Sequence, residues 1–153
     1  MANTYTQIYI QTIFAVKGRH SIISESWEDE LFKYITGIIR NKKQTLLAIN
    51  GHRNHIHILI NLKPVIALSD LIRDIKNNST NFINDKKFIK GKFSWQIGFG
   101  AFSYSYSQID SVIKYIMNQK QHHKSKTFKA EYFEFLKKFQ INYDERYVFD
   151  FDE

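Results

Sequence analysis

The sequence contains no cysteine and only one proline, Pro64, among its 153 residues. Without thiols the chain can form no disulfide, no thiol nucleophile and no cysteine-based zinc site, so a bound metal must rely on histidine, carboxylate or amide ligands. No apolar run approaches the ~20 residues that span a bilayer, and residues 1–11 lack the apolar stretch of a signal peptide. A Walker-type glycine loop is also missing. We therefore expect a cytoplasmic protein with no membrane contact and no nucleotide cofactor.

The charge of the chain indicates a polyanionic partner. It has 22 lysines and arginines against 15 acids, a formal net charge of +7, and a surface of that sign attracts nucleic acid without any special site. Excess lysine also serves solubility, so charge alone does not decide the partner. With 43% hydrophobic residues, residues 1–153 are expected to form one domain with its own core.

Hydrophobic periodicity predicts both strands and helices in the first two thirds of the chain. Residues 5–16 and 101–107 alternate in the two-residue period of strands. Apolar residues recur at helical spacing after Ser24 and Ser26, which are candidate N-caps, and again from Ser69 onward. Each predicted helix therefore follows a predicted strand.

Between these helices the sequence predicts a β-hairpin. Two strand-like runs, 45–49 and 56–62, flank Asn50-Gly51-His52-Arg53, and an Asn-Gly pair favours a tight turn. The resulting order βαββαβ predicts an α+β, ferredoxin-like antiparallel sheet with its helices on one face, as in RNA-recognition modules and several nucleases. This core is expected to cover about residues 4–107.

Two further helices are predicted after the core. The first covers about residues 108–122, and the second covers about 128–139 within a C-terminal segment of about 127–153. The tail from residue 141 holds several aromatic residues among acids. A tail of that composition is expected to pack on the body of the protein or on a partner.

His55-Ile56-His57 is the first group with chemical potential. The apolar residues Ile56 and Ile58 are predicted to face the core, so His55 and His57 must both point to the opposite face of the strand. Side chains two residues apart stand roughly 7 Å from each other, and their ring nitrogens can converge on one ion. Two histidines without function are the alternative interpretation of this motif alone.

The helix predicted over 108–122 carries the second group. Tyr115, Gln119 and His122 fall at i, i+4 and i+7 and therefore share one edge. Taken alone, such an edge is more often a row of solvent-exposed polar side chains without a function. The apolar stripe predicted to be buried on this helix consists of Ile109, Val112, Ile113, Ile116 and Met117.

Together these groups resemble a known family. Asn54-His55-Ile56-His57 with the apolar run after it resembles the HUH motif of single-strand DNA nickases. Tyr115-Ile116-Met117-Asn118-Gln119 resembles the Tyr-x-x-x-Gln motif of the single-tyrosine HUH transposases of small bacterial insertion sequences, the TnpA type, whose relatives include proteins associated with repeated palindromes. The resemblance extends over nearly the whole chain, through the helix 69–80, Trp95-Gln96 before the segment 98–102, and residues 143–147.

The resemblance implies a role for each matching residue. His55 and His57 would bind a divalent ion, Mg²⁺ or Mn²⁺, with Gln119 as a third ligand, and Tyr115 would be the nucleophile. The implied reaction nicks and rejoins single-stranded DNA at hairpin-bearing ends through a 5′-phosphotyrosine. The next aromatic residue after Tyr115 is Phe128, so a one-tyrosine mechanism fits better than that of replication-initiator relatives.

Other functions compete with this interpretation. A histidine-triad hydrolase would need a third histidine where Leu59 stands, and an HxT phosphoesterase would need a second motif. The serious alternative is a non-catalytic RNA-recognition-like module with Trp95, Tyr104 and Tyr106 as stacking residues. A domesticated host relative acting on palindromic repeats would use the same chemistry as a mobile element's enzyme.

The same interpretation predicts the partners. Single-stranded DNA with an imperfect hairpin is the expected substrate, and a homodimer is expected in which the Tyr115 helix completes a site with the other subunit's histidine pair. The candidate phosphate contacts are Arg53, Arg73, Lys76, Lys114 and His122, with Lys120, His123 and Lys124 as further basic residues.

Overall fold

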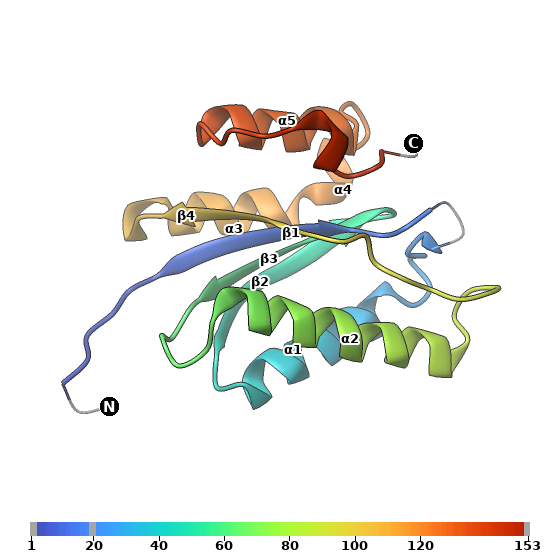
Figure 1. The fold of residues 1–153 in the computed structure, drawn as a ribbon, viewed down its shortest axis with the longest axis horizontal. Helices are drawn as coiled ribbons and strands as arrows, with labels where there is room; N and C mark the ends of the chain where they lie inside the picture. The colour runs from blue at the N-terminus through green and yellow to red at the C-terminus, as the bar shows by residue number, and fades with distance from the viewer. Residues whose placement is uncertain (1–2, 19–20, 152–153) are drawn as a thin grey trace.

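A four-stranded antiparallel sheet forms the middle layer of the computed structural model, which describes residues 3–18 and 21–151 (Figure 1). The strand order is β2-β3-β1-β4, the ferredoxin-like arrangement that the order βαββαβ predicts. The strands are β1 (Tyr9–Ala15), β2 (Thr45–His52), β3 (His55–Asn61) and β4 (Gly100–Tyr104).

Helices cover both faces of this sheet. α1 (Glu28–Asn41) and α2 (Leu68–Lys86) lie on one face, and the C-terminal helices α3 (Ile109–Met117), α4 (Gln119–His122) and α5 (Phe128–Lys138) lie on the other (Figure 1). Short 3₁₀ turns form η2 (Tyr106–Gln108) and η3 (Glu145–Tyr147). Among residues 3–18 and 21–151, no helix combines the length and apolarity that crossing a membrane requires.

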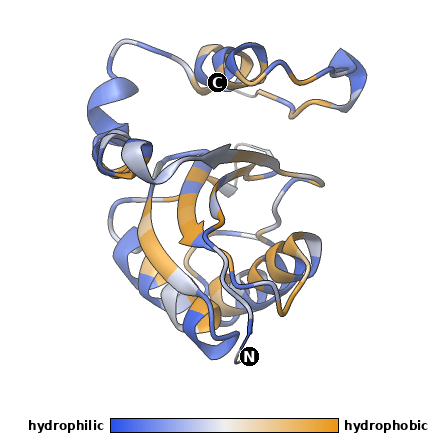
Figure 2. Cartoon of the chain, turned by 90° about the vertical axis from the view of Figure 1, so that its left-hand side faces the viewer, coloured by the Kyte–Doolittle hydropathy of each residue, from blue (hydrophilic) through white to orange (hydrophobic). Residues whose placement is uncertain are grey.

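The larger core lies between the sheet and the helices α1 and α2. Ile56 and Ile58 of β3 are fully buried there together with Leu31 and Ile35 of α1. Each such side chain contributes about 1.5–3 kcal/mol relative to an exposed one. Figure 2 colours the ribbon by hydropathy and shows apolar residues in the strands, with polar residues on the helices that surround them.

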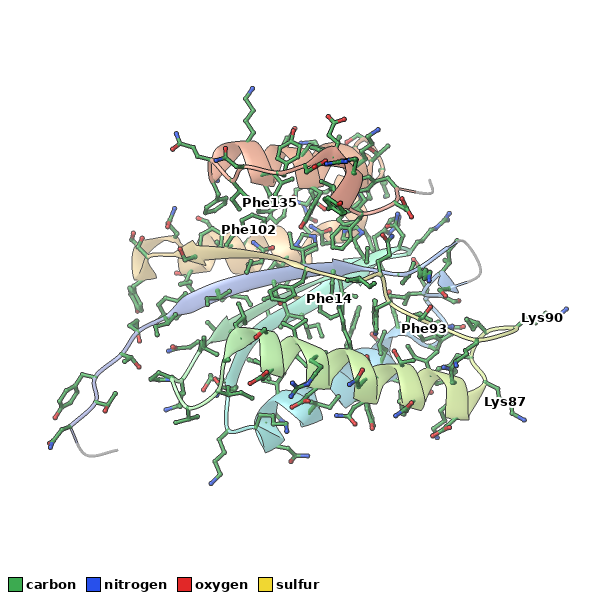
Figure 3. All side chains as sticks on the ribbon, in the orientation of Figure 1. Phe14, Lys87, Lys90, Phe93, Phe102 and Phe135 are labelled. Atoms are coloured by element: carbon green, nitrogen blue, oxygen red, sulfur yellow. The ribbon has the colours of Figure 1, made fainter. Side chains whose placement is uncertain are left out.

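Aromatic residues fill both sides of the sheet. Phe14 and Phe93 lie between the sheet and α2, whereas Phe102 contacts Phe135 of α5 on the other side, with ring centroids 5.0 Å apart (Figure 3). The tail also packs as predicted, because Phe149 is buried with its ring centroid 4.9 Å from that of Tyr132 in α5.

The hairpin turn lies three residues later than the sequence predicts. His52 pairs with His55, so Arg53 and Asn54 form the turn, and Asn50 and Gly51 belong to β2. Gly51 is required by close packing instead, since a Cβ atom there would clash with the carbonyl oxygen of His55. Asn50 donates hydrogen bonds to the carbonyls of Ile116 and Met117, at 3.0 and 3.2 Å.

Those hydrogen bonds join the β2–β3 hairpin to the end of α3. The prediction of one continuous helix is wrong at this point. The helix expected over 108–122 is broken at Asn118, whose φ of −101° and ψ of 20° separate α3 from α4. Met117, predicted to be buried, is 57% exposed at this break. Asn50 stabilises the break because it satisfies carbonyls that a continuous helix would use.

The remaining differences concern the ends of elements. α1 begins at Glu28 after Trp27, and neither Ser24 nor Ser26 provides a side-chain cap. The last strand ends at Tyr104 because a capping box between Ser105 and Gln108 starts the turn η2. The predicted strand over 101–107 thus includes the residue that caps η2. The cap ends the strand at Tyr104, although the two-residue alternation continues to residue 107.

Candidate active site and metal centre

His55 and His57 lie on the face of β3 that is turned away from α1 and α2, as the sequence predicts. Both side chains are completely buried, and their ring centroids are 5.1 Å apart. The ring of Phe128 in α5 stacks on His55 at 3.9 Å. The pair is therefore covered by α5 rather than open on the surface of the sheet.

Two amides fix the orientation of the imidazoles. Nδ1 of His57 lies 2.6 Å from Oε1 of Gln11, and Nδ1 of His55 lies 2.9 Å from Oδ1 of Asn54. An amide oxygen only accepts, so each Nδ1 carries the proton and each Nε2 presents a lone pair. Burial lowers the pKa of His55 to about 4, which keeps this imidazole neutral at physiological pH.

The predicted residues of α3 and α4 reach the same place within one chain. Oε1 of Gln119 lies 3.0 Å from Nε2 of His55. The ring centroid of Tyr115 lies 6.1 Å from that of His57, and the ring of His122 stacks on Tyr115 at 4.5 Å. The break at Asn118 does not separate Tyr115 from Gln119, because the two side chains still point toward one centre.

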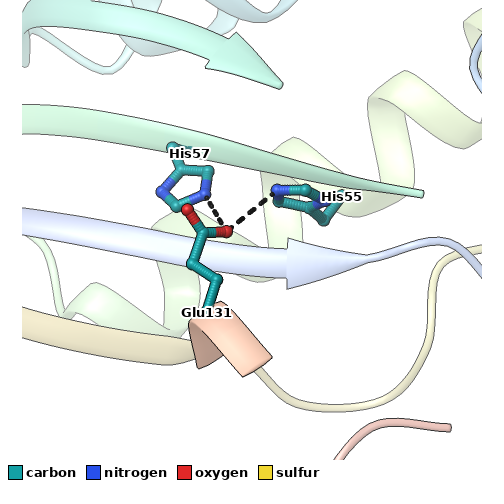
Figure 4. A group of neighbouring side chains, drawn as sticks. All are labelled: His55, His57 and Glu131. Carbon is teal, nitrogen blue, oxygen red and sulfur yellow. Dashed lines mark hydrogen bonds and ion pairs between the residues drawn. The ribbon is translucent and has the colours of Figure 1, made fainter. Parts of the chain in front are cut away.

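Glu131 of α5 is the main site residue that the sequence did not reveal. Its Oε1 lies 3.2 Å from Nε2 of His57 and 3.3 Å from Nε2 of His55 (Figure 4). Its Oε2 accepts hydrogen bonds from Gln119 Nε2, at 2.9 Å, and from the hydroxyl of Tyr115. The carboxylate is only 1% exposed and touches every predicted catalytic or metal-binding residue.

A signal for Glu131 was present in the sequence. It lies three residues after Phe128 and four before Phe135, on the apolar stripe that α5 buries. A carboxylate on such a stripe is rarely buried unless it is paired. Burial opposes ionisation of Glu131, and the carboxylate lies among three polar partners, the imidazoles of His55, His57 and His123.

The charge on Glu131 also affects Tyr115. Burial, followed by the negative charge of Glu131 and the hydrogen bond to it, raises the pKa of Tyr115 well above its ordinary value. The phenol is thus protonated in this conformation.

His123 is the second residue whose place the sequence did not predict. Its Nε2 lies 3.1 Å from both Gln119 Oε1 and Glu131 Oε1, and its side chain is 3% exposed. The sequence grouped it with basic residues that could contact phosphate. The turn between α4 and α5 instead directs it inward.

The five candidate phosphate contacts do not form one patch. Arg53 lies at the β2–β3 turn, Lys114 lies on the exposed side of α3, and His122 contacts Tyr115. Arg73 and Lys76 belong to α2, on the other face of the sheet (Figure 1).

Both residues of α2 already have partners. Arg73 pairs with Asp70 at 3.1 Å and with Asp74 at 3.3 Å. Lys76 donates to the carbonyls of Gln96 and Gly98, and burial lowers its pKa to about 8. Lys76 therefore holds the 96–98 loop against α2.

A cavity of about 460 Å³ adjoins the nucleophile candidate. Tyr115 and Gln11 line it on the side of the site, Phe135 and Lys138 line it from α5, and Tyr104 lines it from β4. The imidazoles are buried, but Tyr115 borders this cavity between α3 and α5.

The fold and this site together define the class of tyrosine transposases: a histidine pair on a central strand faces a tyrosine from the helix that follows the sheet. The family of IS200-like transposases matches residues 4–119, and the chain belongs to that family. The match ends at Gln119, so His123 and Glu131 lie beyond it.

Solved structures share the fold. A candidate transposase from Deinococcus radiodurans R1 superimposes with a TM-score of 0.61 at 20% identity, over 76% of this chain and 94% of that one. A REP-associated tyrosine transposase bound to a REP hairpin gives a TM-score of 0.60 at 18% identity, over 79% and 72% of the two chains. No curated protein matches the sequence.

Proposed function

We propose that this transposase nicks and rejoins single-stranded DNA at hairpin-bearing ends, with Tyr115 as the nucleophile and Mg²⁺ or Mn²⁺ held by His55, His57 and Gln119. One observation carries the proposal: the Tyr115 hydroxyl and the Nε2 atoms of both histidines meet around the single carboxylate of Glu131. A group that bonds to phosphorus and groups that bind a cation thus face the same point.

The chemistry of the donor set fits a divalent cation. Nε2 of His55 and Oε1 of Gln119 both present lone pairs, 3.0 Å apart, and Nε2 of His57 faces Oε1 of Glu131 in the same way. Lone pairs directed at each other repel unless a positive charge lies between them. A bound divalent ion would supply that charge and would also reduce the repulsion between the nucleophile and the scissile phosphate.

The residues of the chain perform the remaining steps. Tyr115 Oη forms the bond to phosphorus as the bond from phosphorus to the 3′ oxygen breaks, which leaves a 5′-phosphotyrosine and a free 3′-hydroxyl. The phenol gives up its proton on the side of Glu131 Oε2, and the departing 3′ oxygen takes up a proton. The covalent link conserves the phosphodiester, so attack by another 3′-hydroxyl rejoins the strand.

Several features support DNA as the substrate. The net charge of +7 attracts a polyanion, and the cavity beside Tyr115 has aromatic walls in Tyr104 and Phe135 on which a base can stack. Arg53 and Lys114 are the proposed phosphate contacts on the site's face, with His122 beside the nucleophile. Arg73 and Lys76 are proposed contacts for DNA that continues over the second face.

The proposal includes a homodimer with exchanged nucleophile helices. Within the single chain, Tyr115 reaches its own histidine pair, and the same contacts would form between subunits if α3 to α5 changed places. The connection over residues 105–108 is exposed throughout, so it can be redirected without uncovering a core. Two nucleophiles in one assembly would suit a reaction that cuts two DNA ends.

The test is incubation of the full chain with 5′- or 3′-labelled single-stranded oligonucleotides that carry hairpins from the DNA flanking its gene. With Mg²⁺ or Mn²⁺, denaturing gels should show a protein-linked band that retains the label on the 3′ side of the nick. With EDTA the band should be absent. The 5′-labelled fragment should be free of protein, whereas a 3′-labelled cleavage product without a protein adduct would contradict the phosphotyrosine.

A further inference from the structure

Three imidazoles, not two, are directed at the centre of the site. Nδ1 of His123 lies 2.7 Å from the carbonyl oxygen of Lys126, which only accepts a hydrogen bond, just as Gln11 and Asn54 accept from His57 and His55. In all three rings Nδ1 therefore carries the proton. Each Nε2 consequently presents its lone pair inward.

These three nitrogens meet two oxygens. Glu131 Oε1 lies 3.3, 3.2 and 3.1 Å from Nε2 of His55, His57 and His123. Gln119 Oε1 lies 3.0 Å from Nε2 of His55 and 3.1 Å from Nε2 of His123. Gln119 uses its amide nitrogen to donate to Glu131 Oε2, so its oxygen is the atom turned toward the centre.

The separations among these atoms match the edges of a coordination polyhedron. Neighbouring ligands of an octahedral ion are separated by √2 times the bond length, about 3.0–3.1 Å for bonds of about 2.1–2.2 Å. The five distances quoted for the donors lie at or close to that value. Five lone-pair atoms at such separations in a buried site repel each other unless a cation is shared among them.

We infer that His123 and Glu131 are ligands of the same cation as His55, His57 and Gln119, which makes a centre of three imidazoles, one carboxylate and one amide. The inference rests on the proposed function only in assuming that a divalent ion is bound. Two of the five ligands come from residues beyond the matched family segment 4–119. The C-terminal part of the chain is then a component of the active site.

This ligand set has consequences for the choice of ion. Mg²⁺ prefers oxygen ligands and retains several waters, whereas three imidazole nitrogens suit Mn²⁺ and later transition metals. The carboxylate of Glu131 adds a negative charge that the amide of Gln119 cannot supply. An ion that takes six ligands would retain room for a phosphate oxygen beside these five, so the centre could still hold a substrate.

The experiment measures Mn²⁺ binding to the full chain, without DNA, from the electron paramagnetic resonance signal of free Mn²⁺. His123→Asn and Glu131→Gln should each weaken binding at least about tenfold, since even groups that only orient ligands cost about 10- to 100-fold. The matched controls His122→Asn and Glu134→Gln should bind Mn²⁺ as the unmodified chain does, because neither neighbour contacts the donor set. Mg²⁺ should compete weakly.

A second readout counts the ligands. Pulsed paramagnetic resonance of the Mn²⁺ complex should show three coupled imidazole nitrogens in the unmodified chain and in His122→Asn, but two in His123→Asn. Circular dichroism of the metal-free variants should match that of the unmodified chain, which separates ligand loss from unfolding. If a variant unfolds, the nitrogen count in the folded chain still tests the role of His123.

The results that would overturn the inference differ from those that would overturn the proposed function. Unchanged Mn²⁺ affinity in both variants, with two coupled nitrogens, would limit the centre to His55, His57 and Gln119 and leave the proposed function intact. Faster DNA nicking by Glu131→Gln would show that the carboxylate blocks the centre. Loss of the covalent DNA adduct despite intact Mn²⁺ binding would instead contradict the proposed reaction.

Discussion

The hydroxyl of Tyr115 donates a hydrogen bond to the carboxylate of Glu131, and this bond joins α3 to α5 at the centre of the site. Burial and the neighbouring negative charge both raise the pKa of Tyr115, so the phenol is kept protonated while Glu131 is its partner. In the proposed reaction a scissile phosphate, which is also an anion, approaches the same hydroxyl. Binding of DNA would then require Glu131 to turn toward the proposed cation or α5 to shift.

Replacement of Tyr115 by phenylalanine should abolish the covalent DNA adduct and leave Mn²⁺ affinity and hairpin binding within about twofold. The change removes only the hydroxyl that bonds to phosphorus, and it keeps the ring stacked on His122. Denaturing gels and electrophoretic mobility shifts measure the two properties. Tyr143→Phe, which alters a partly exposed ring of the tail, should nick normally, and an adduct in Tyr115→Phe would assign the nucleophile elsewhere.

His55→Ala should separate catalysis from DNA binding. The variant loses a cation ligand, so we expect nicking to fall by at least about 100-fold, or about 2.7 kcal/mol at 1.36 kcal/mol per tenfold. Hairpin binding should change by only a few fold because it depends mainly on phosphate contacts. Single-turnover cleavage and filter binding on one oligonucleotide give both values. Equal losses in the two assays would indicate a structural role for His55.

The salt dependence of hairpin binding tests the phosphate contacts on the site's face. Arg53→Gln and Lys114→Gln should each reduce the slope of log K against log salt concentration by about 1, because each removes one released counterion. Fluorescence anisotropy at several salt concentrations provides the slopes. Lys90→Gln changes a lysine that projects from the far end of the molecule (Figure 3) and should leave the slope unchanged. Equal slopes for Arg53→Gln, Lys114→Gln and Lys90→Gln would contradict the assignment of Arg53 and Lys114 as phosphate contacts.

The stability of the metal-free protein should fall as the pH falls from about 6.5 toward 4. The folded-state pKa of His55 is about 4, against 6.5 for a free imidazole, so in this window the unfolded chain binds a proton that the folded chain does not. At pH 5 this linkage removes about 2 kcal/mol of the free energy of unfolding. Urea unfolding at pH 7.5 and pH 5 measures the loss, which should be smaller in His55→Gln. If the free energy of unfolding of His55→Gln fell as much between pH 7.5 and pH 5, groups other than His55 would cause the loss.

Mixing two inactive variants tests the exchanged dimer. His55→Ala and Tyr115→Phe chains, combined under conditions that allow subunit exchange, should recover nicking, because one composite site of the mixed dimer then contains neither change. A covalent-adduct gel detects the recovery, and mass spectrometry of differently tagged chains confirms the exchange. Continued inactivity in confirmed mixed dimers would show that each chain uses its own Tyr115, as the single-chain geometry allows.

The local sequence determined the fold class and four residues of the site. The two-residue period of β3 placed His55 and His57 on one face, opposite to Ile56 and Ile58, and helical spacing gave Tyr115 and Gln119 a common edge. These are properties of neighbouring residues on one element, so the backbone period alone fixes them. The order βαββαβ led to the ferredoxin-like sheet for another reason, because short connections and right-handed crossovers leave few arrangements for this order of elements.

Only the tertiary structure decided which further residues meet at that site. The hairpin turn moved to Arg53 and Asn54, and Asn50 became the partner of the end of α3, because contacts from distant segments outweigh the turn preference of Asn-Gly. Glu131 and His123 join the histidine pair for a similar reason. Their positions depend on how α5 packs across the sheet, through aromatic contacts such as Phe135 on Phe102, and no local period encodes the distance between two elements.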